Sequence, residues 1–240
     1  MTNELVAGCA TRGATVGEIA ANLPGATAVF RRFGMDFCCK GNVALAQSAR
    51  ERGVDLADVE RALAALDGSS DRSAAPRESA ALIDHILSRY HDTHRRELPE
   101  LIQLARKVEK VHAKRSDAPR GLADLLERMS IELQQHMAKE ELILFPAMKQ
   151  SIAVGLDAPI ARMRHEHDDH GAHLRELDRL TNGITVPADG CRTWQALYAG
   201  LAKLTNDLME HIHLENNVLF PRFSAGEGGA GFDRGLCGRL

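Results

Sequence analysis

Four long stretches of the chain repeat apolar residues every three to four positions. They cover residues 78–112, 121–150, 158–182 and 192–222. This spacing places the apolar side chains on one face of an α-helix, and the alternation typical of a half-buried strand is almost absent. Short breaks with proline or glycine separate the stretches, and short connections favour antiparallel neighbours. The pattern predicts an all-α protein built on an up-down-up-down four-helix bundle.

A smaller helical unit precedes the bundle. Thr15 and Glu18 have the spacing of a capping box, and Asp55 is placed to cap a later helix. The stretch after this unit is polar and made of small residues, as in a linker, and the end of the chain is rich in glycine. We expect a small N-terminal helical domain over 1–67, a linker over 68–77, the bundle over 78–224 and a flexible tail over 225–240.

Histidines and glutamates lie on the apolar stripes of all four long helices. Positions three or four apart share a helix face, so these side chains point with the leucines into the bundle. A buried carboxylate costs several kcal/mol unless it is paired, and cations between the helices would pair it. Spacing alone leaves His91 or His94, and His167 or His170, as alternatives. The candidates are His91, His94, His136, Glu140, His167, His170, His211 and Glu215.

The second and fourth helices carry an internal repeat. His136 is followed by Glu140 after four positions and then by a Phe-Pro pair, and His211 is followed by Glu215 and another Phe-Pro pair at the same spacing. A histidine-bearing segment precedes each copy. The chain therefore reads as two helix pairs, each of which offers one lone histidine and one His-x-x-x-Glu.

Composition excludes several classes of protein. The net charge is -3 and no dense Lys/Arg block is present, which argues against a nucleic-acid partner. No apolar run reaches the roughly 20 residues that cross a bilayer, so no membrane role is expected. The five cysteines are odd in number and irregularly spaced, so we do not expect a disulfide framework. We expect the reducing cytoplasm as the location of the protein.

Mixed nitrogen and oxygen ligands suit iron, manganese or zinc. No cysteine lies on the bundle stripes, which disfavours structural zinc. No nucleophile-and-base arrangement surrounds the candidate ligands, so a zinc hydrolase is disfavoured as well.

Longer motifs carry a resemblance to a known family. The bundle resembles the hemerythrin-like domain, and the chain from about 14 to 224 resembles the RIC (repair of iron centres) family. The motifs are Met35-Asp36-Phe37-Cys38-Cys39, Arg89-Tyr90-His91-Asp92-x-His94-Arg95, Leu98-Pro99-Glu100-Leu101, Val111-His112-Ala113, His136-Met137-x-Lys139-Glu140-Glu141, Glu166-His167-Asp168 and His211-x-x-Leu214-Glu215-Asn216-Asn217-Val218-Leu219-Phe220-Pro221.

The resemblance implies a non-haem centre of two iron ions, carboxylate-bridged and oxo-bridged. Its terminal ligands would be His91, His136, His167 and His211, and its bridging carboxylates Glu140 and Glu215. His165, His170 and His173 depart from the family pattern, so we expect surface or outer roles for them. We expect His213 to be exposed, because it falls on the helix face opposite His211.

The resemblance also implies a function. It is the repair of iron–sulfur clusters damaged by nitrosative or oxidative stress, in which the protein reacts with nitric oxide and donates iron. Cys38 and Cys39 would lie near the entrance to the centre and assist iron or nitric oxide traffic.

Damaged iron–sulfur proteins are then the expected partners, and a homodimer is an expectation by analogy. The alternative is a protein that lowers cytoplasmic nitric oxide by binding or reducing it, since it would use the same six ligands. Oxygen binding or sensing, as in simple hemerythrins, is disfavoured because of the added N-terminal unit.

Overall fold

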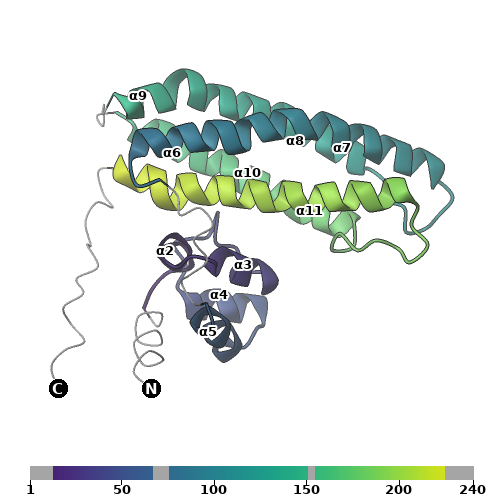
Figure 1. The fold of residues 1–240 in the computed structure, drawn as a ribbon, viewed down its shortest axis with the longest axis horizontal. Coiled ribbons are helices and arrows are strands. Elements are labelled where there is room, and N and C mark those ends of the chain that lie inside the picture. The colour runs from purple at the N-terminus through teal and green to yellow at the C-terminus, as the bar shows by residue number, and fades with distance from the viewer. Residues whose placement is uncertain (1–12, 67–75, 151–154, 225–240) are drawn as a thin grey trace.

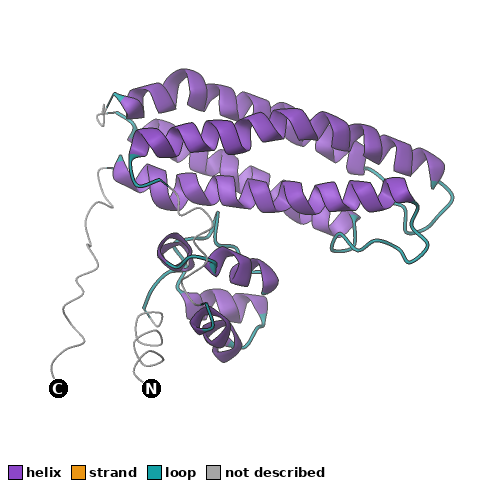
Figure 2. Cartoon of the chain, in the orientation of Figure 1, coloured by secondary structure: helices purple, strands orange, loops and turns teal. Residues whose placement is uncertain are grey.

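The structure, a computed structural model, describes residues 13–66, 76–150 and 155–224. The regular structure of these residues consists of helices alone, without strands (Figure 2). One isolated β-bridge joins Thr15 and Ala44. The prediction of an all-α fold is confirmed. The expected linker over 68–77 and the tail over 225–240 lie almost wholly outside the described residues.

Four short helices form the N-terminal unit. Thr15 accepts a hydrogen bond from the Glu18 N–H, and the Glu18 carboxylate accepts one from the Thr15 N–H, as the capping box predicts. Asp55 caps the last helix of the unit through the Ala57 N–H. The four helices are α2 (Val16–Asn22), α3 (Ala26–Arg32), α4 (Leu45–Arg52) and α5 (Leu56–Ala64).

Four long helical rods lie side by side and form the bundle (Figure 1). The first rod consists of α6 (Ser79–Ile86), η1 (Leu87–His91) and α7 (Asp92–Val111), and the second of α8 (Leu122–Lys139), η2 (Glu140–Leu144) and α9 (Phe145–Lys149). The third rod is α10 (Asp157–Leu180), and the fourth consists of α11 (Arg192–His213), η3 (Leu214–Leu219) and η4 (Phe220–Arg222). These rods coincide with the four stretches that the apolar pattern predicts.

Three of the rods contain a wider π-helical turn. In η2 and η3 the N–H of the phenylalanine that follows the segment donates five residues back, Phe145 to the Glu140 carbonyl and Phe220 to the Glu215 carbonyl. A proline comes next in both rods, and it has no N–H and crowds the carbonyl of the preceding turn. The widened turn accommodates this proline. Such turns occur most often at functional sites.

The buried apolar residues form two clusters within the bundle. Along the second rod, Leu133 belongs to one cluster and Leu144 to the other, and along the fourth rod Leu208 and Leu219 are divided in the same way. The first cluster continues into the N-terminal unit, where it includes Phe37. The histidines and glutamates of the apolar stripes lie in the polar layer between the two clusters.

The N-terminal unit lies against the fourth and third rods. The side-chain amide of Asn217 donates to the Phe37 carbonyl at 3.0 Å, and that of Asn216 donates to the Cys38 carbonyl at 3.0 Å. Asn217 approaches Gly41 so closely that a Cβ at this position would lie 2.2 Å from the Asn217 Oδ1. Only glycine, which has no Cβ, allows this approach. A pair of asparagines thus attaches this unit directly beside Glu215.

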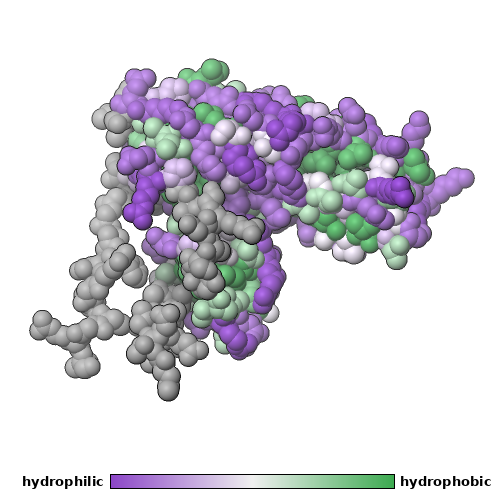
Figure 3. Space-filling model, viewed as in Figure 1, coloured by the Kyte–Doolittle hydropathy of each residue, from purple (hydrophilic) through white to green (hydrophobic). Residues whose placement is uncertain are grey.

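The visible face of the bundle is mostly hydrophilic (Figure 3). Apolar side chains gather there near the end of the bundle that carries the loop between α10 and α11. None of the helices in the described ranges combines the length and apolar character that crossing a bilayer requires.

Candidate metal centre

Six side chains of the polar layer are withdrawn from solvent and converge on one another. They are His91 (0% exposed), His136 (1%), Glu140 (0%), His167 (0%), His211 (0%) and Glu215 (0%). Their donor atoms fall into two groups of four, and within each group all atoms lie within 4.8 Å of one another. His91 and His211 belong to the first group and His136 and His167 to the second, whereas both glutamates belong to both groups.

Each glutamate presents one oxygen to each histidine pair. Glu140 Oε2 lies 3.4 Å from His91 Nε2, and Glu140 Oε1 lies 3.4 Å from His136 Nε2. Glu215 Oε1 lies 3.0 Å from His211 Nε2, and Glu215 Oε2 lies 3.0 Å from His167 Nε2. Each carboxylate therefore reaches both pairs of imidazoles, and the two groups of donor atoms share both glutamates.

Hydrogen bonds on the outer ring nitrogens fix the orientation of three of the four imidazoles. His91 Nδ1–H donates to Glu141 Oε1 at 2.7 Å, and His136 Nδ1–H donates to Glu166 Oε2 at 3.0 Å. His167 Nδ1–H donates to Asn216 Oδ1 at 2.9 Å, and the amide group of Asn216 is oriented by its donation to the Cys38 carbonyl. A proton on Nδ1 leaves the lone pair on Nε2, which faces inward, as in known metal-ligating histidines.

The inward lone pairs test whether a metal fits. The Nε2 atoms of His136 and His167 lie 3.1 Å apart, and both rings already donate through Nδ1. Two lone pairs at this distance repel each other unless a positive charge lies near them. Neither oxygen of Glu140 has a hydrogen-bond partner among the described residues. A buried acceptor without a donor is costly, so the donor set fits a cation.

The charges of the centre lead to the same conclusion. Burial would raise the pKa of Glu215, but His211 and His167 outweigh it and hold this pKa well below its ordinary value. Burial would lower the pKa of His136, but Glu140 and Glu166 outweigh it and raise this pKa to about 10. The buried carboxylates therefore draw positive charge into the layer. Protons on the imidazoles or metal ions would supply that charge.

The internal repeat has a structural basis. The residue after each glutamate binds the outer nitrogen of a histidine on another rod: Glu141 binds His91, and Asn216 binds His167. The phenylalanine of each copy stacks on that same histidine, Phe145 on His91 with ring centres 5.8 Å apart and Phe220 on His167 with ring centres 6.0 Å apart. Each copy thus supplies one histidine, one glutamate, one hydrogen-bond partner and one stacking ring.

His94 and His170 are the alternatives that spacing left open, and neither belongs to the two groups of donors. Both are buried, with His94 tilted against His211 and His170 edge-on to His136 at a distance of 5.2 Å between ring centres. His165, by contrast, is exposed. The expectation of surface or outer positions for His165 and His170 agrees with this arrangement.

The prediction that His213 is exposed is wrong. Its side chain is 3% exposed and packs edge-on against Phe37, with ring centres 5.5 Å apart, and its Nδ1 accepts a hydrogen bond from Asn217. Burial lowers the pKa of His213 to about 4, so the ring is neutral at neutral pH. The helix face opposite His211 is covered by the N-terminal unit, which a single-helix projection does not include.

Cys38 and Cys39 lie where the N-terminal unit meets α10. Their sulfurs are 3.7 Å apart, and the Cys39 thiol donates to the His167 carbonyl at 3.3 Å. The hydrogen bond with the Cys39 sulfur is the main cause, and burial the next, of a pKa of Cys38 well above its ordinary value. Cys38 is therefore a thiol at neutral pH. Cys38, Cys39 and Cys191 are free cysteines.

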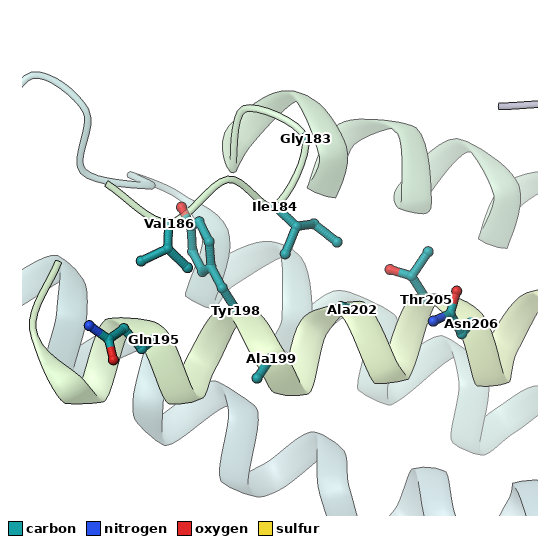
Figure 4. A pocket seen from close by; sticks show the side chains of 9 residues that line it. All are labelled: Gly183, Ile184, Val186, Gln195, Tyr198, Ala199, Ala202, Thr205 and Asn206. Atoms are coloured by element: carbon teal, nitrogen blue, oxygen red, sulfur yellow. The ribbon is translucent and has the colours of Figure 1, made fainter. Parts of the chain in front are cut away.

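Figure 4 shows a pocket elsewhere in the bundle, between α11 and the loop after α10. Ile184, Val186 and Tyr198 contribute to its wall. Its lining contains no histidine, cysteine or carboxylate, so this pocket offers no ligand for a metal.

Sequence reasoning missed the outer partners. Glu166 binds His136 and also pairs with Lys139 and Arg162, and Tyr90 stacks on His211 with ring centres 5.6 Å apart. Both residues directly precede a candidate histidine in sequence. Their position next to a candidate histidine in the sequence could have identified them as residues close to the centre.

Comparison with known proteins identifies two domains. The model described as the hemerythrin HHE cation-binding domain matches residues 82–223. A second model, described only as a domain of unknown function (DUF542), matches residues 12–67.

Three relatives match nearly the whole chain. The iron-sulfur cluster repair protein YtfE of Musicola paradisiaca is 48% identical over 90% of this chain and 98% of its own length. The protein of the same name from Citrobacter koseri is 47% identical over 90% of this chain and 99% of its own length. The probable iron-sulfur cluster repair protein of Haemophilus influenzae is 46% identical over 85% of this chain and 94% of its own length.

The buried histidine and glutamate layer, the matched cation-binding domain and the identity over both domains agree with one another. The chain belongs to the family of iron–sulfur cluster repair proteins that carry a hemerythrin HHE domain.

Proposed function

We propose that this protein repairs damaged iron–sulfur clusters and that it does so with two iron ions held between the four rods of the bundle. One observation carries the proposal: the Glu140 and Glu215 carboxylates each face both histidine pairs. The repair function named for the relatives supports it.

In this proposal His91 and His211 would hold one iron, His136 and His167 would hold the other, and Glu140 and Glu215 would serve both. Two nitrogen and two carboxylate ligands per ion suit iron, which would supply redox chemistry and coordination positions for an oxo bridge or a small ligand. The chain itself keeps three of the four imidazoles, those of His91, His136 and His167, in one tautomer through their outer hydrogen-bond partners. Phe145 and Phe220 shield the histidines from water by stacking on them.

Iron is also the cargo of the proposed repair. Protonation or displacement of a histidine or glutamate would weaken the hold on iron, since metal affinity depends on deprotonated ligands. Cys38 and Cys39 would assist this traffic. Their position beside the His167 backbone, at 3.3 Å from Cys39 Sγ to the carbonyl, supports that role.

A repair assay tests the proposal. An enzyme whose iron–sulfur cluster has been damaged by nitric oxide is incubated with the iron-loaded protein or with an equal amount of free ferrous iron. We expect activity to return faster with the protein, and a Glu140→Leu variant to give no more than free iron gives. Equal rates for the wild-type protein and free iron would contradict the donor role.

Nitric oxide is a proposed partner, as a reactant at the centre. The alternative function, binding or reduction of nitric oxide in the cytoplasm, uses the same ligands and is separated by gas analysis. The protein is mixed with nitric oxide and an excess of a chemical reductant, which supplies the two electrons for each nitrous oxide formed. Nitrous oxide formed over many turnovers would favour the alternative, and its absence would rule out an enzymatic reduction of nitric oxide. The cytoplasmic location and the homodimer also stay predictions, and gel filtration of the iron-loaded protein tests the latter.

A further inference from the structure

A second cluster of metal-ligand residues lies beside the candidate centre, in the groove between α8 and α10. It consists of Glu132, His170 and His173, which each offer a donor atom within 4.8 Å of the other two. Glu132 precedes His136 by one helical turn, and His170 and His173 follow His167 by one and two turns. Because α8 and α10 run antiparallel, these three residues come together on the same side of the centre.

Two ring nitrogens of this cluster, one on each histidine, lack a hydrogen-bond partner among the described residues. His170 is 2% exposed, and its Nε2 has no hydrogen-bond partner among the described residues. The same holds for His173 Nδ1, which lies 3.5 Å from Glu132 Oε2, too far for a good hydrogen bond. Buried imidazole nitrogens without partners are rare in native structures. A ligand between these side chains would satisfy them.

The internal repeat provides an independent comparison. Asp207 stands one turn before His211, as Glu132 stands one turn before His136, and Glu97 follows His91 at the spacing at which His173 follows His167. In the half of the centre that contains His91 and His211, a cationic side chain of the protein lies between Glu97 and Asp207. Lys203 Nζ donates to Glu97 Oε2 at 2.7 Å and to Asp207 Oδ2 at 2.8 Å.

Among the described residues, no lysine or arginine forms an ion pair with Glu132. Arg128 occupies the position that corresponds to Lys203, but it is exposed and forms no ion pair with Glu132 in the described ranges. Arg89, which also pairs with Asp207, corresponds to the exposed His165. Glu132 therefore keeps the acidic character of Asp207 in the repeat, but the lysine that neutralises Asp207 has no counterpart that pairs with Glu132.

We propose that Glu132, His170 and His173 form a third metal site, which binds one divalent transition-metal cation in the place that Lys203 Nζ takes in the other half. Two imidazoles and one carboxylate are a donor set that suits zinc or ferrous iron and leaves positions for water. Glu132 is 44% exposed and His173 is 20% exposed, so the cation reaches the site directly from solvent. The site uses none of the six ligands of the proposed iron centre.

Zinc titration of the iron-loaded full-length protein tests this site. Isothermal titration calorimetry measures the zinc affinity, and metal analysis after desalting counts zinc and iron in each sample. We expect one zinc ion to bind in addition to the iron. Glu132→Gln and His173→Gln should each weaken its binding by more than the roughly 10- to 100-fold that the loss of an outer partner of a ligand costs.

Two matched variants serve as controls. Glu127→Gln changes a glutamate of the same helix with nearly equal exposure, 43%, and His165→Gln changes an exposed histidine of α10. Both should bind zinc as the wild-type protein does. Zinc binding of equal affinity in the Glu132→Gln and His173→Gln variants, or no added zinc in the wild-type protein, would overturn the site. An iron content of about two per chain in each sample separates this result from a failure of the iron centre, because it shows that the six other ligands hold their metal.

Discussion

The two halves of the candidate centre share their inner groups and differ in what surrounds them. In each half two Nε2 atoms lie 3.1 Å apart, and one oxygen of each glutamate faces them. In each half a phenylalanine stacks on the lone histidine, and the residue after the glutamate binds its outer nitrogen. The repeat thus preserves the groups that would touch a metal.

The outer groups of the two halves have different roles. Beside His136 and His167, Glu166 and Asn216 satisfy both outer nitrogens, and Asn216 also joins the N-terminal unit at Cys38. Beside His91 and His211, Tyr90 takes the position that corresponds to Glu166, and His211 Nδ1 has no hydrogen-bond partner among the described residues. Asn216 thus connects an outer nitrogen of the second half directly to the N-terminal unit, so this half would respond to changes at the junction.

The largest effect is expected from the loss of a glutamate, because each glutamate serves both halves of the centre. Glu140→Leu or Glu215→Leu takes away a ligand shared by both pairs, so we expect iron content measured by metal analysis to fall from about two per chain to near zero. Helix content by circular dichroism and the exposed Glu127→Leu variant are the controls. Normal iron content in either variant would refute the shared-ligand assignment.

Acid should destabilise the folded protein through His213, which lies where α11 meets the N-terminal unit. Its pKa is about 4 in the folded protein and its ordinary value is 6.5, so the unfolded chain binds the proton more tightly. The stabilisation is complete above pH 6.5 and is lost as pH falls towards 4. Between pH 7 and pH 5 this one group should cost about 2 kcal/mol of unfolding free energy.

Denaturant unfolding at both pH values checks this effect. His213→Gln removes the titrating ring, so the wild-type protein should lose about 2 kcal/mol more between pH 7 and pH 5 than the variant does. An equal loss in both proteins would show that His213 is not the group responsible.

Removal of one outer partner from each half sharpens the comparison further. Glu141→Ala leaves His91 Nδ1 without an acceptor, and Asn216→Ala does the same to His167. Each should lower iron affinity by roughly 10- to 100-fold, measured by competition with a chelator. Asn216→Ala should in addition speed proteolytic separation of the N-terminal unit from the bundle, because the contact with Cys38 is lost. The same rate of cleavage in both variants would contradict the one-sided coupling.

The smallest effect is expected at Tyr90. Burial raises the pKa of Tyr90 to about 12, so this residue stays a neutral ring stacked on His211. Tyr90→Phe keeps the stacking, and iron affinity should stay within about twofold of wild type, since the ring and not the hydroxyl makes the contact. Tyr90→Ala is the matched variant that removes the ring and should weaken iron retention. A Tyr90→Phe variant that loses iron would assign the hydroxyl a direct role.

Several features of the fold and the site were predictable from the sequence. The periodicity of the apolar residues sets the four rods, and the phase of His136, Glu140, His211 and Glu215 within their stripes sets their burial. The capping box at Thr15 was predictable because it involves only neighbouring residues. These features depend on distances of a few residues along one helix.

Other features were not predictable, because they depend on contacts between distant segments. The burial of His213 comes from Phe37 of the N-terminal unit, and the widened turns after Glu140 and Glu215 change the helix phase beyond them. Spacing did not distinguish His91 from His94, since both face inward. In the structure His91 meets the glutamates, whereas His94 lies beside His211.

The sequence by itself determined which side chains enter the bundle, because helix periodicity fixes the face of each residue regardless of its neighbours. Only the tertiary structure decided which of them meet and what lies behind each one. It paired the rods, brought Asn216 and Cys38 together, and placed Lys203 in one half of the repeat, whereas no described lysine or arginine pairs with Glu132 in the other. Contacts across rods depend on the packing of the whole chain, which no local pattern encodes.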